Sequence, residues 1–262
     1  MRLCTWNIHG AFGLDGARDL ARVAGVLREL RCDVAALQEV GDPQNRAAAQ
    51  RAAREGLRPD AGDDAAELAR LLGWGVAYGP NLVIGNRPYG NAVLSRFPIA
   101  RAQNHDHSVR GHEPRGCLRA DLELPGGRSL HLFNLHLGLS GGERRRQASR
   151  LLSADLLRDA ALTSPMVVCG DFNLWWPGPV QRLLRSELHD AAHSAGATWP
   201  SALPLLRLDR AYVDDGVRVL GSGVFKDLPA RVSSDHLPLW LDLEPIVNSA
   251  TLAPLASGER GG

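Results

Sequence analysis

Short apolar runs that end in polar residues recur along the chain. Residues 2–8 predict a first strand ending near Asn7, and apolar positions at helical spacing predict a helix within residues 15–30. Residues 32–37 predict a second buried strand, with Glu39 just beyond its end. Because parallel strands joined by a helix present their carboxyl ends at one edge of a sheet, this order places Asn7 and Glu39 together.

The rest of the chain carries strand and helix patterns of the same kind, separated by turns rich in Gly and Pro. Further strands are predicted within residues 90–99, 117–124, 128–136, 166–169, 205–214, 217–225 and 233–243. Helices are predicted over residues 43–72 with a break near 58–62, and over 142–162 and 177–184. Two pairs of strands are expected to form hairpins, 117–124 with 128–136 and 205–214 with 217–225.

One strand end is the focus of the candidate chemistry. The apolar residues 166–169 predict a buried strand, Gly170 turns the chain, and Asp171 and Asn173 follow. Ligands bind beyond the carboxyl ends of strands in α/β sheets, so an acid and an amide at this point are placed for chemistry. The alternative is a turn that Asp171 and Asn173 merely stabilise through their own backbone.

Composition indicates a globular protein without a broad basic surface. The chain has 262 residues, of which 44% are hydrophobic and 23% charged, and a formal net charge of +1. A single α/β domain over residues 1–245 with a loose tail over 246–262 is expected. The amino terminus lacks an apolar signal core, and no apolar run is long enough to cross a membrane. Four scattered cysteines without a CxxC pair favour a reducing cytoplasm. We expect a monomer.

Polar groups capable of catalysis follow several predicted strands. They are Asn7, Glu39, His136, Asp171, Asn173, Asp209, Asp235 and His236. Converging carboxylates repel one another, which requires a cation or shifted pKa values. Oxygen ligands without a thiolate favour Mg²⁺, with Mn²⁺ as a substitute, over zinc. A hard cation with histidines as proton carriers is typical of phosphoester hydrolysis. The simpler alternatives are a strand-end cap at Asn7 and an ion-pair partner at Asp209.

A second group of histidines lies in residues 101–115, which the sequence predicts to be irregular. His105, His107 and His112 could form a zinc site, but no cysteine or further ligand has suitable spacing. A polar loop at the rim of an active site is the favoured interpretation.

Taken together, the motifs resemble those of the endonuclease/exonuclease/phosphatase superfamily. The motifs, in the family's order, are TWNIHG, LQEV, GNAVLSRFPI, NLHLG, GDFN, LDRAYV and SDHLPL, and they run from residue 2 to about residue 243. The resemblance implies a four-layer α/β/β/α sandwich of two mixed β-sheets flanked by helices. It also implies a metal-dependent phosphoesterase.

The resemblance assigns a role to each motif residue. Glu39 is the main metal ligand, and Asn7 and Asp235 lie near the same or a second metal position. Asp209 orients His236, which acts as general base or positions the nucleophile.

The other motif residues are expected at the phosphoryl group. Asp171 polarises the attacking water, and Asn173 donates to a phosphoryl oxygen. His136 stabilises the developing charge or assists the leaving group. The expected step is in-line attack of water with inversion at phosphorus.

Departures from the family pattern bear on the substrate. His136 stands where repair nucleases carry a tyrosine, and His9 where they often carry a metal-binding acid. GNAVLS has no glutamate to pair with His136, so the group that orients this histidine is left open.

Candidate substrate-binding residues are Arg115, Trp175 and Trp176, although a tryptophan of this pair could equally belong to the core. The arginines at 144–146 could meet a phosphate or be solvated surface residues. The substrate is expected to be a phosphodiester, either nucleic acid or a phospholipid or other small diester. A phosphomonoesterase and a non-catalytic binding protein are the alternatives.

Overall fold

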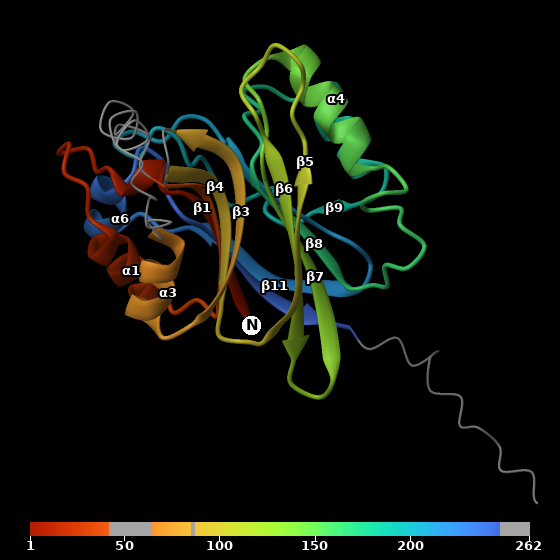
Figure 1. Ribbon diagram of the computed structural model, residues 1–262, viewed down its shortest axis with the longest axis horizontal. Helices are drawn as coiled ribbons and strands as arrows, with labels where there is room; N and C mark the ends of the chain where they lie inside the picture. Colours follow the sequence, from red (N-terminus) through yellow and green to blue (C-terminus); the bar gives the residue numbers. More distant parts are fainter. Residues whose placement is uncertain (42–63, 85–86, 247–262) are drawn as a thin grey trace, which may run out of the picture.

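Two β-sheets pack face to face at the centre of the molecule, and helices cover their outer faces (Figure 1). The computed structural model describes residues 1–41, 64–84 and 87–246. Each sheet has six strands, with one parallel pair among antiparallel neighbours. The architecture is therefore the expected four-layer α/β/β/α sandwich.

The first sheet has the strand order β11-β12-β1-β2-β4-β3. Its strands are β1 (Arg2–Asn7), β2 (Val34–Val40), β3 (Gly75–Ile84), β4 (Arg87–Ser95), β11 (Val217–Val224) and β12 (Leu239–Pro245). Its outer face is covered by α1 (Leu20–Glu29), α3 (Asp64–Leu72) and α6 (Leu228–Ser233). A short 3₁₀ turn, η1 (His9–Ala11), follows β1.

The second sheet has the strand order β5-β6-β7-β8-β10-β9. Its strands are β5 (Ile99–Asp106), β6 (Gly116–Leu124), β7 (Arg128–His136), β8 (Met166–Asp171), β9 (His189–Asp190) and β10 (Asp209–Val213). The helices α4 (Gly141–Leu151) and α5 (Pro179–Arg185) cover its outer face.

Apolar residues form three layers of core. The layer between the sheets contains Leu3, Val93, Leu132 and Val167, all fully buried. Separate outer layers join each sheet to its helices. Because the central strands are buried on both faces, they appear in the sequence as continuous apolar runs rather than alternating ones.

A buried amide network ties the two sheets together beneath the site. Gln38 in β2 donates from Nε2 to Asn134 Oδ1 in β7 at 2.7 Å. Asn134 Nδ2 donates back to the carbonyl of Leu37 at 2.8 Å, and Asn91 Nδ2 donates to the carbonyl of Gly116 at 3.0 Å. These buried hydrogen bonds cross from sheet to sheet and fix the relative position of the two sheets, although Gln38 Oε1 and Asn91 Oδ1 have no hydrogen-bond partner among the described residues.

The predicted hairpin of residues 205–214 and 217–225 is wrong. Strand β10 pairs with β8 and β9 in the second sheet, whereas β11 pairs with β12 in the first. The connection between them crosses from sheet to sheet. Asp214 Oδ1 accepts the backbone N–H of Met166 at 3.0 Å, and a Cβ at Gly216 would lie 1.7 Å from Ser164 Oγ. This tight crossing has the same Asp-Gly sequence signal as a hairpin turn.

Other predictions need smaller corrections. The helix predicted within 15–30 begins only at Leu20, because Asp19 caps it by accepting the backbone N–H of Arg22. The helix predicted to reach residue 162 ends at Leu151. Residues 99–106, expected to be partly irregular, form β5. Strand β3 was not predicted. It contains Pro80 and lies at the edge of its sheet, where a proline is tolerated.

Two predictions fall partly outside the described residues. The helical connection predicted over 43–72 is described only from residue 64, where α3 begins. The tail predicted over 246–262 is described only at residue 246.

Candidate active site

Strand register places three of the predicted residues side by side in the second sheet. His136 of β7 pairs with Asp171 of β8, and Asp171 pairs with Asp209 of β10. Paired residues on neighbouring strands present their side chains on the same face. Gly170 makes this arrangement possible, because a Cβ there would lie 1.9 Å from the carbonyl oxygen of Leu135.

The first sheet contributes an acid and an amide that reach across to this row. Glu39 lies at a register shift between β2 and β4 and has a positive φ of 56°. Asn7 Nδ2 donates to Glu39 Oε1 at 2.9 Å and to Asp171 Oδ2 at 3.2 Å. Its Oδ1 accepts the backbone N–H of His9 at 3.0 Å. Asn7 therefore joins the acids of the two sheets.

Backbone strain is concentrated at this junction. Glu39, His9 and Asn173 all adopt positive φ, a region that residues other than glycine rarely occupy. Conformations of this kind persist where surrounding contacts enforce them, and they cluster at functional sites.

The segment before β12 completes the site. The hydroxyl of Ser234 donates to the carbonyl of Asn7 at 2.7 Å, and Trp6 Nε1 donates to the carbonyl of His236 at 2.9 Å. With the backbone held in this way, His236 Nδ1 lies 2.8 Å from Asp209 Oδ2. Its Nε2 lies 3.7 Å from Asp171 Oδ2.

Burial and neighbouring charge shift two pKa values in this row. Burial raises the pKa of Asp171 to about 6. Burial alone would lower the pKa of His236, but the carboxylates of Asp209 and Asp171 outweigh it and raise the pKa to about 10. His236 is thus an imidazolium at neutral pH, and Asp171 is an unusually basic carboxylate.

The pKa of His136 shifts in the opposite direction to that of His236. Its pKa is lowered well below the usual value by burial first, and then by the charges of Arg115 and His236. The ring is therefore neutral at neutral pH. Its Nε2 lies 3.2 Å from Asn173 Nδ2, and Asn173 Nδ2 also donates to the carbonyl of Leu137 at 2.9 Å. Asn173 is the neighbour that positions His136, a partner the sequence left open.

A cleft of about 370 Å³ opens over these groups. Nine of the predicted site residues line it, namely Asn7, Glu39, Arg115, His136, Asp171, Asn173, Trp175, Asp235 and His236. Asp209 is fully buried behind His236. Trp176 does not line the cleft and is 74% exposed.

Two residues that hydrogen-bond to acids of the cleft were missed by the sequence analysis. Tyr89 of β4 donates its hydroxyl to Glu39 Oε2 at 2.6 Å. Trp199 donates from Nε1 to Asp235 Oδ2 at 3.1 Å, and its ring lies 6.0 Å from that of Trp175. Neither belongs to a motif; only the general tendency of tryptophan to lie at binding sites could have pointed to Trp199.

The donor set of the cleft fits a hard divalent cation. Glu39, Asp171 and Asp235 bring three carboxylates to the cleft, and the carboxylate of Asp209 is buried behind His236. Ligand atoms of Asp171, Asp209 and His236 lie within 4.8 Å of one another and could also hold a cation. Because Asp209 is already hydrogen-bonded to His236, we favour the acids around Glu39, which are oxygen donors facing the cleft.

The second group of histidines forms no metal cluster among the described residues. The Nδ1 atom of His112 lies 3.2 Å from Glu143 Oε2. His107 is buried, and neither of its ring nitrogens is hydrogen-bonded within the described part of the chain. His105 belongs to β5.

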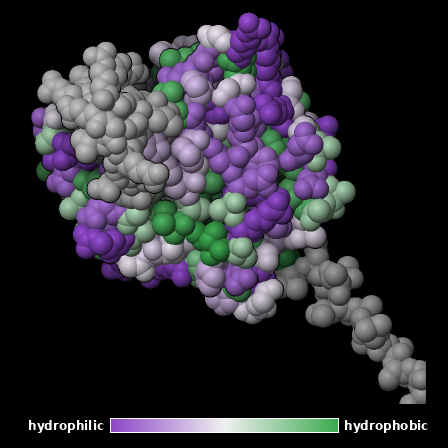
Figure 2. Space-filling view, viewed as in Figure 1, coloured by the Kyte–Doolittle hydropathy of each residue, from purple (hydrophilic) through white to green (hydrophobic). Residues whose placement is uncertain are grey.

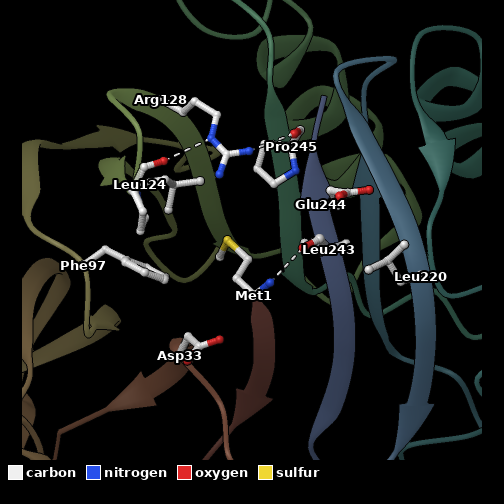
Figure 3. Close-up of a pocket in the computed structure, with 10 residues that line it drawn as sticks. Met1, Asp33, Phe97, Leu124, Arg128, Leu220, Leu243, Glu244 and Pro245 are labelled. Atoms are coloured by element: carbon white, nitrogen blue, oxygen red, sulfur yellow. Dashed lines mark hydrogen bonds between the residues drawn. The ribbon is translucent and has the colours of Figure 1, made fainter. Parts of the chain in front are cut away.

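A larger hollow, of about 440 Å³, lies at the opposite end of β1 (Figure 3). Its polar groups are already used within the protein. The amino group of Met1 donates to the carbonyl of Leu243 at 2.9 Å, and Arg128 donates to the carbonyls of Pro125 and Pro245. Size alone therefore does not select the candidate active site, and we base the choice on the acids that converge in the smaller cleft.

Comparison with known proteins places this geometry in context. A sequence profile of the Endonuclease/Exonuclease/phosphatase family matches residues 4–236. The protein YbhP of Escherichia coli K12 is 35% identical over 256 residues, covering 92% of this chain and 95% of YbhP.

Solved structures show the same fold. An endonuclease/exonuclease/phosphatase from Beutenbergia cavernae is 24% identical and has a TM-score of 0.72, over 94% of this chain and 72% of that one. A mannosyl-6-phosphatase from Bacteroides thetaiotaomicron is 17% identical and has a TM-score of 0.75, over 93% and 99% of the two chains. At these identities the likeness concerns the fold alone.

Proposed function

This chain belongs to the endonuclease/exonuclease/phosphatase family, and we propose that it is a Mg²⁺-dependent phosphodiesterase. The observation that carries the proposal is the aligned set Asp209, His236 and Asp171 facing Glu39 across a cleft. Members of this family are hydrolases that act on phosphoester bonds.

Glu39, Asn7 and Asp235 are proposed to hold the cation, with Mn²⁺ as a possible substitute for Mg²⁺. Tyr89 and Trp199 hold the carboxylates of Glu39 and Asp235 by direct hydrogen bonds, which fixes their orientation. When bound, the cation supplies charge neutralisation at the phosphoryl oxygens.

Asp171 and His236 are proposed to manage the protons. A carboxylate with a pKa of about 6 is ionised at neutral pH and is basic enough to take a proton from an attacking water. The imidazolium of His236 lies on the same side and can donate to a phosphoryl oxygen. Asp209 stabilises that imidazolium and fixes its ring. This assignment moves the role of general base from His236, where the family resemblance put it, to Asp171.

Two further side chains, His136 and Arg115, are proposed to bind the phosphoryl group. The neutral ring of His136 offers a hydrogen bond to the developing charge or to the leaving oxygen, and Asn173 holds that ring in place; Asn173 itself can donate to a phosphoryl oxygen only by exchanging its contact with His136. Arg115 is 8% exposed and its Nε has no partner among the described residues, although one terminal nitrogen pairs with Glu113 at 2.7 Å. A free guanidinium edge in a cleft is suited to an anionic oxygen.

The organic part of the substrate is proposed to lie against Trp175 and Trp199. Their rings form a tilted wall of the cleft, with an interplanar angle of 43°. Among diesters, a compact substrate is favoured over long nucleic acid. A net charge of +1 provides no broad basic field for nucleic acid, and the aromatic wall suits a compact organic group. A non-catalytic role is disfavoured because every motif residue is present. The four free, buried cysteines are compatible with a cytoplasmic site of action.

The test compares an aryl phosphodiester with the corresponding phosphomonoester, using purified protein and Mg²⁺ in isotopically labelled water. The proposal predicts faster turnover of the diester and incorporation of one labelled oxygen into the phosphate product. Faster turnover of the monoester would instead make the protein a phosphomonoesterase.

Cation binding is measured separately by calorimetric titration of Mg²⁺ into wild-type protein and Glu39→Gln. Loss of binding in Glu39→Gln is expected. Equal binding by the two proteins would remove Glu39 from the proposed ligand set.

A further inference from the structure

Exposed hydrophobic side chains are concentrated beside the cleft. Ten large hydrophobic side chains are exposed among the described residues. Half of them lie on three loops that follow β7, β8 and β9, and we name this set the apolar rim: Leu139, Trp175, Trp176, Leu203 and Leu205. On the face drawn in Figure 2, hydrophilic side chains prevail, including those over α4. The apolar rim is therefore a local feature rather than a general property of the surface.

The apolar rim is continuous with the proposed active site. Leu139 and Trp175 line the cleft. The ring of Trp175 contacts that of Trp199, which begins the loop carrying Leu203 and Leu205. Trp176, the candidate substrate residue that does not line the cleft, extends this surface outward with 74% of its area exposed.

The loops that carry the apolar rim are held in place. The backbone N–H of Leu205 donates to the carbonyl of Trp199 at 2.9 Å, and Arg231 donates from Nη1 to the carbonyl of Ser201 at 3.2 Å. On the opposite side, Arg144 donates to the carbonyl of Gly138 at 3.1 Å, next to Leu139. The exposed leucines are thus presented by a fixed backbone instead of being folded inward.

Positive charge without a partner lies beside the apolar rim. The helices α4 and α5 pack against each other and start just after the first two loops. Arg145 and Arg146 of α4 and Arg182 and Arg185 of α5 are exposed, and none forms an ion pair with a described residue. The first turn of α5 has no acidic residue.

We propose that the apolar rim binds the surface of an anionic phospholipid bilayer and that the substrate is a phospholipid presented there. The inference rests on the proposed phosphodiesterase function and supplies its substrate class. Tryptophan and leucine at a fixed edge insert into the boundary between head groups and acyl chains, and arginines nearby attract anionic head groups. The strength of such peripheral binding increases with the buried apolar area and with the electrostatic attraction to anionic lipids.

The placement of the cleft is consistent with a lipid head group as substrate. Leu139 and Trp175 belong both to the apolar rim and to the cleft wall, so a surface that contacts the rim brings its head groups to Arg115 and His136. None of the helices in the described residues is long and apolar enough to span a membrane, so the rim is the element that would hold the protein at the lipid surface.

The test is sedimentation of the full chain with vesicles in EDTA, so that binding is measured without turnover. Two vesicle preparations are compared. The anionic vesicles contain phosphatidylglycerol and phosphatidylcholine, and the neutral vesicles contain phosphatidylcholine alone. We expect binding to the anionic vesicles and affinity at least about tenfold lower for Leu203→Ser/Leu205→Ser. The matched control is Leu220→Ser, an exposed leucine on β11, which is expected to bind like wild type.

Charge is tested with Arg182→Gln/Arg185→Gln, which is expected to weaken binding to anionic vesicles only. Equal binding by wild type and Leu203→Ser/Leu205→Ser, or no binding by wild type, overturns the proposal. A dimer in solution that Leu203→Ser/Leu205→Ser dissociates also overturns it, because the apolar rim would then bind a second copy.

A further comparison separates this proposal from the function on which it rests. Turnover of a soluble aryl phosphodiester is expected to be unchanged in Leu203→Ser/Leu205→Ser, whereas release of a water-soluble phosphate product from vesicles falls about tenfold with binding. Equal release from vesicles by the two proteins overturns the lipid proposal alone. If neither protein hydrolyses the soluble ester, the result counts against the phosphodiesterase proposal. Vesicle binding in EDTA, which needs no turnover, then still tests whether the apolar rim binds a lipid surface.

Discussion

The Nδ1 atom of His236 lies 2.8 Å from the Oδ2 atom of Asp209, and both side chains are almost fully buried. A buried imidazolium beside a buried carboxylate is stable only while the pair is intact, since either charge alone would be left without compensation. The pair therefore links the proposed proton chemistry to the strand register that brings β10 beside β8.

Asp209→Asn should lower the pKa of His236 from its raised value, because burial remains while the main opposing charge is removed. Turnover should fall about 10²- to 10⁴-fold, the usual contribution of a positioned acid–base group. Histidine NMR titration and the pH dependence of kcat report the two effects. An unchanged His236 pKa in the folded variant would contradict the assignment.

Asp171→Asn should abolish turnover and yet stabilise the metal-free protein at alkaline pH. The folded-state pKa of Asp171, about 6, exceeds the ordinary value of 3.8. Ionisation therefore disfavours the folded state as the pH rises through the window between these two pKa values. Above the window the variant should gain up to about 3 kcal/mol in unfolding free energy. Urea denaturation in EDTA on both sides of the window measures the gain. A variant less stable than wild type above the window would show that the ionised carboxylate stabilises the fold.

His107 should make the protein acid-sensitive. Burial is the main cause that lowers its pKa from 6.5 to about 4, and neither ring nitrogen has a described partner. Between these values the unfolded chain binds a proton that the folded chain does not, so stability falls as pH falls, by about 3 kcal/mol in total. Denaturation across this range should show a loss about 3 kcal/mol smaller in His107→Leu than in wild type, because the buried His136 contributes its own loss to both proteins. His193→Gln, a change at an exposed histidine, is the control and should behave like wild type.

Arg115→Met should raise KM for a phosphoester about tenfold, as expected for loss of a charge-assisted contact. The pKa of His136 should rise at the same time, because the charge of Arg115 contributes to lowering it. Glu113→Gln is the matched control, since it removes the ion-pair partner and keeps the guanidinium. Kinetics with histidine NMR checks both effects, and an unchanged KM would exclude Arg115 from substrate binding.

Much of the fold and the position of the site could be predicted from local sequence. Buried strands are continuous apolar runs, and the polar residue that ends each run is visible without knowledge of the fold. His136, Asp171 and Asp209 each end or begin such a run, and strand pairing then places them in one row. Local signals therefore locate the edge at which the chemistry gathers.

Features that depend on distant contacts could not be predicted in this way. Trp199 reaches Asp235 through a proline-rich loop, and Tyr89 reaches Glu39 from a neighbouring strand. The chain from Asp214 to Val217 crosses between sheets with residues that are equally suitable for a hairpin. In each case the outcome is set by packing between segments far apart in the chain, for which a single sequence carries no direct signal.

Hydrolysis of bis(para-nitrophenyl) phosphate by wild type and Asp171→Ala, in Mg²⁺ and in excess EDTA, tests the proposed catalytic centre most directly. A metal-dependent centre predicts turnover by wild type in Mg²⁺, none in EDTA, and none by Asp171→Ala under either condition. Turnover that persists in EDTA, or in Asp171→Ala with Mg²⁺, would contradict a metal-dependent centre built around Asp171.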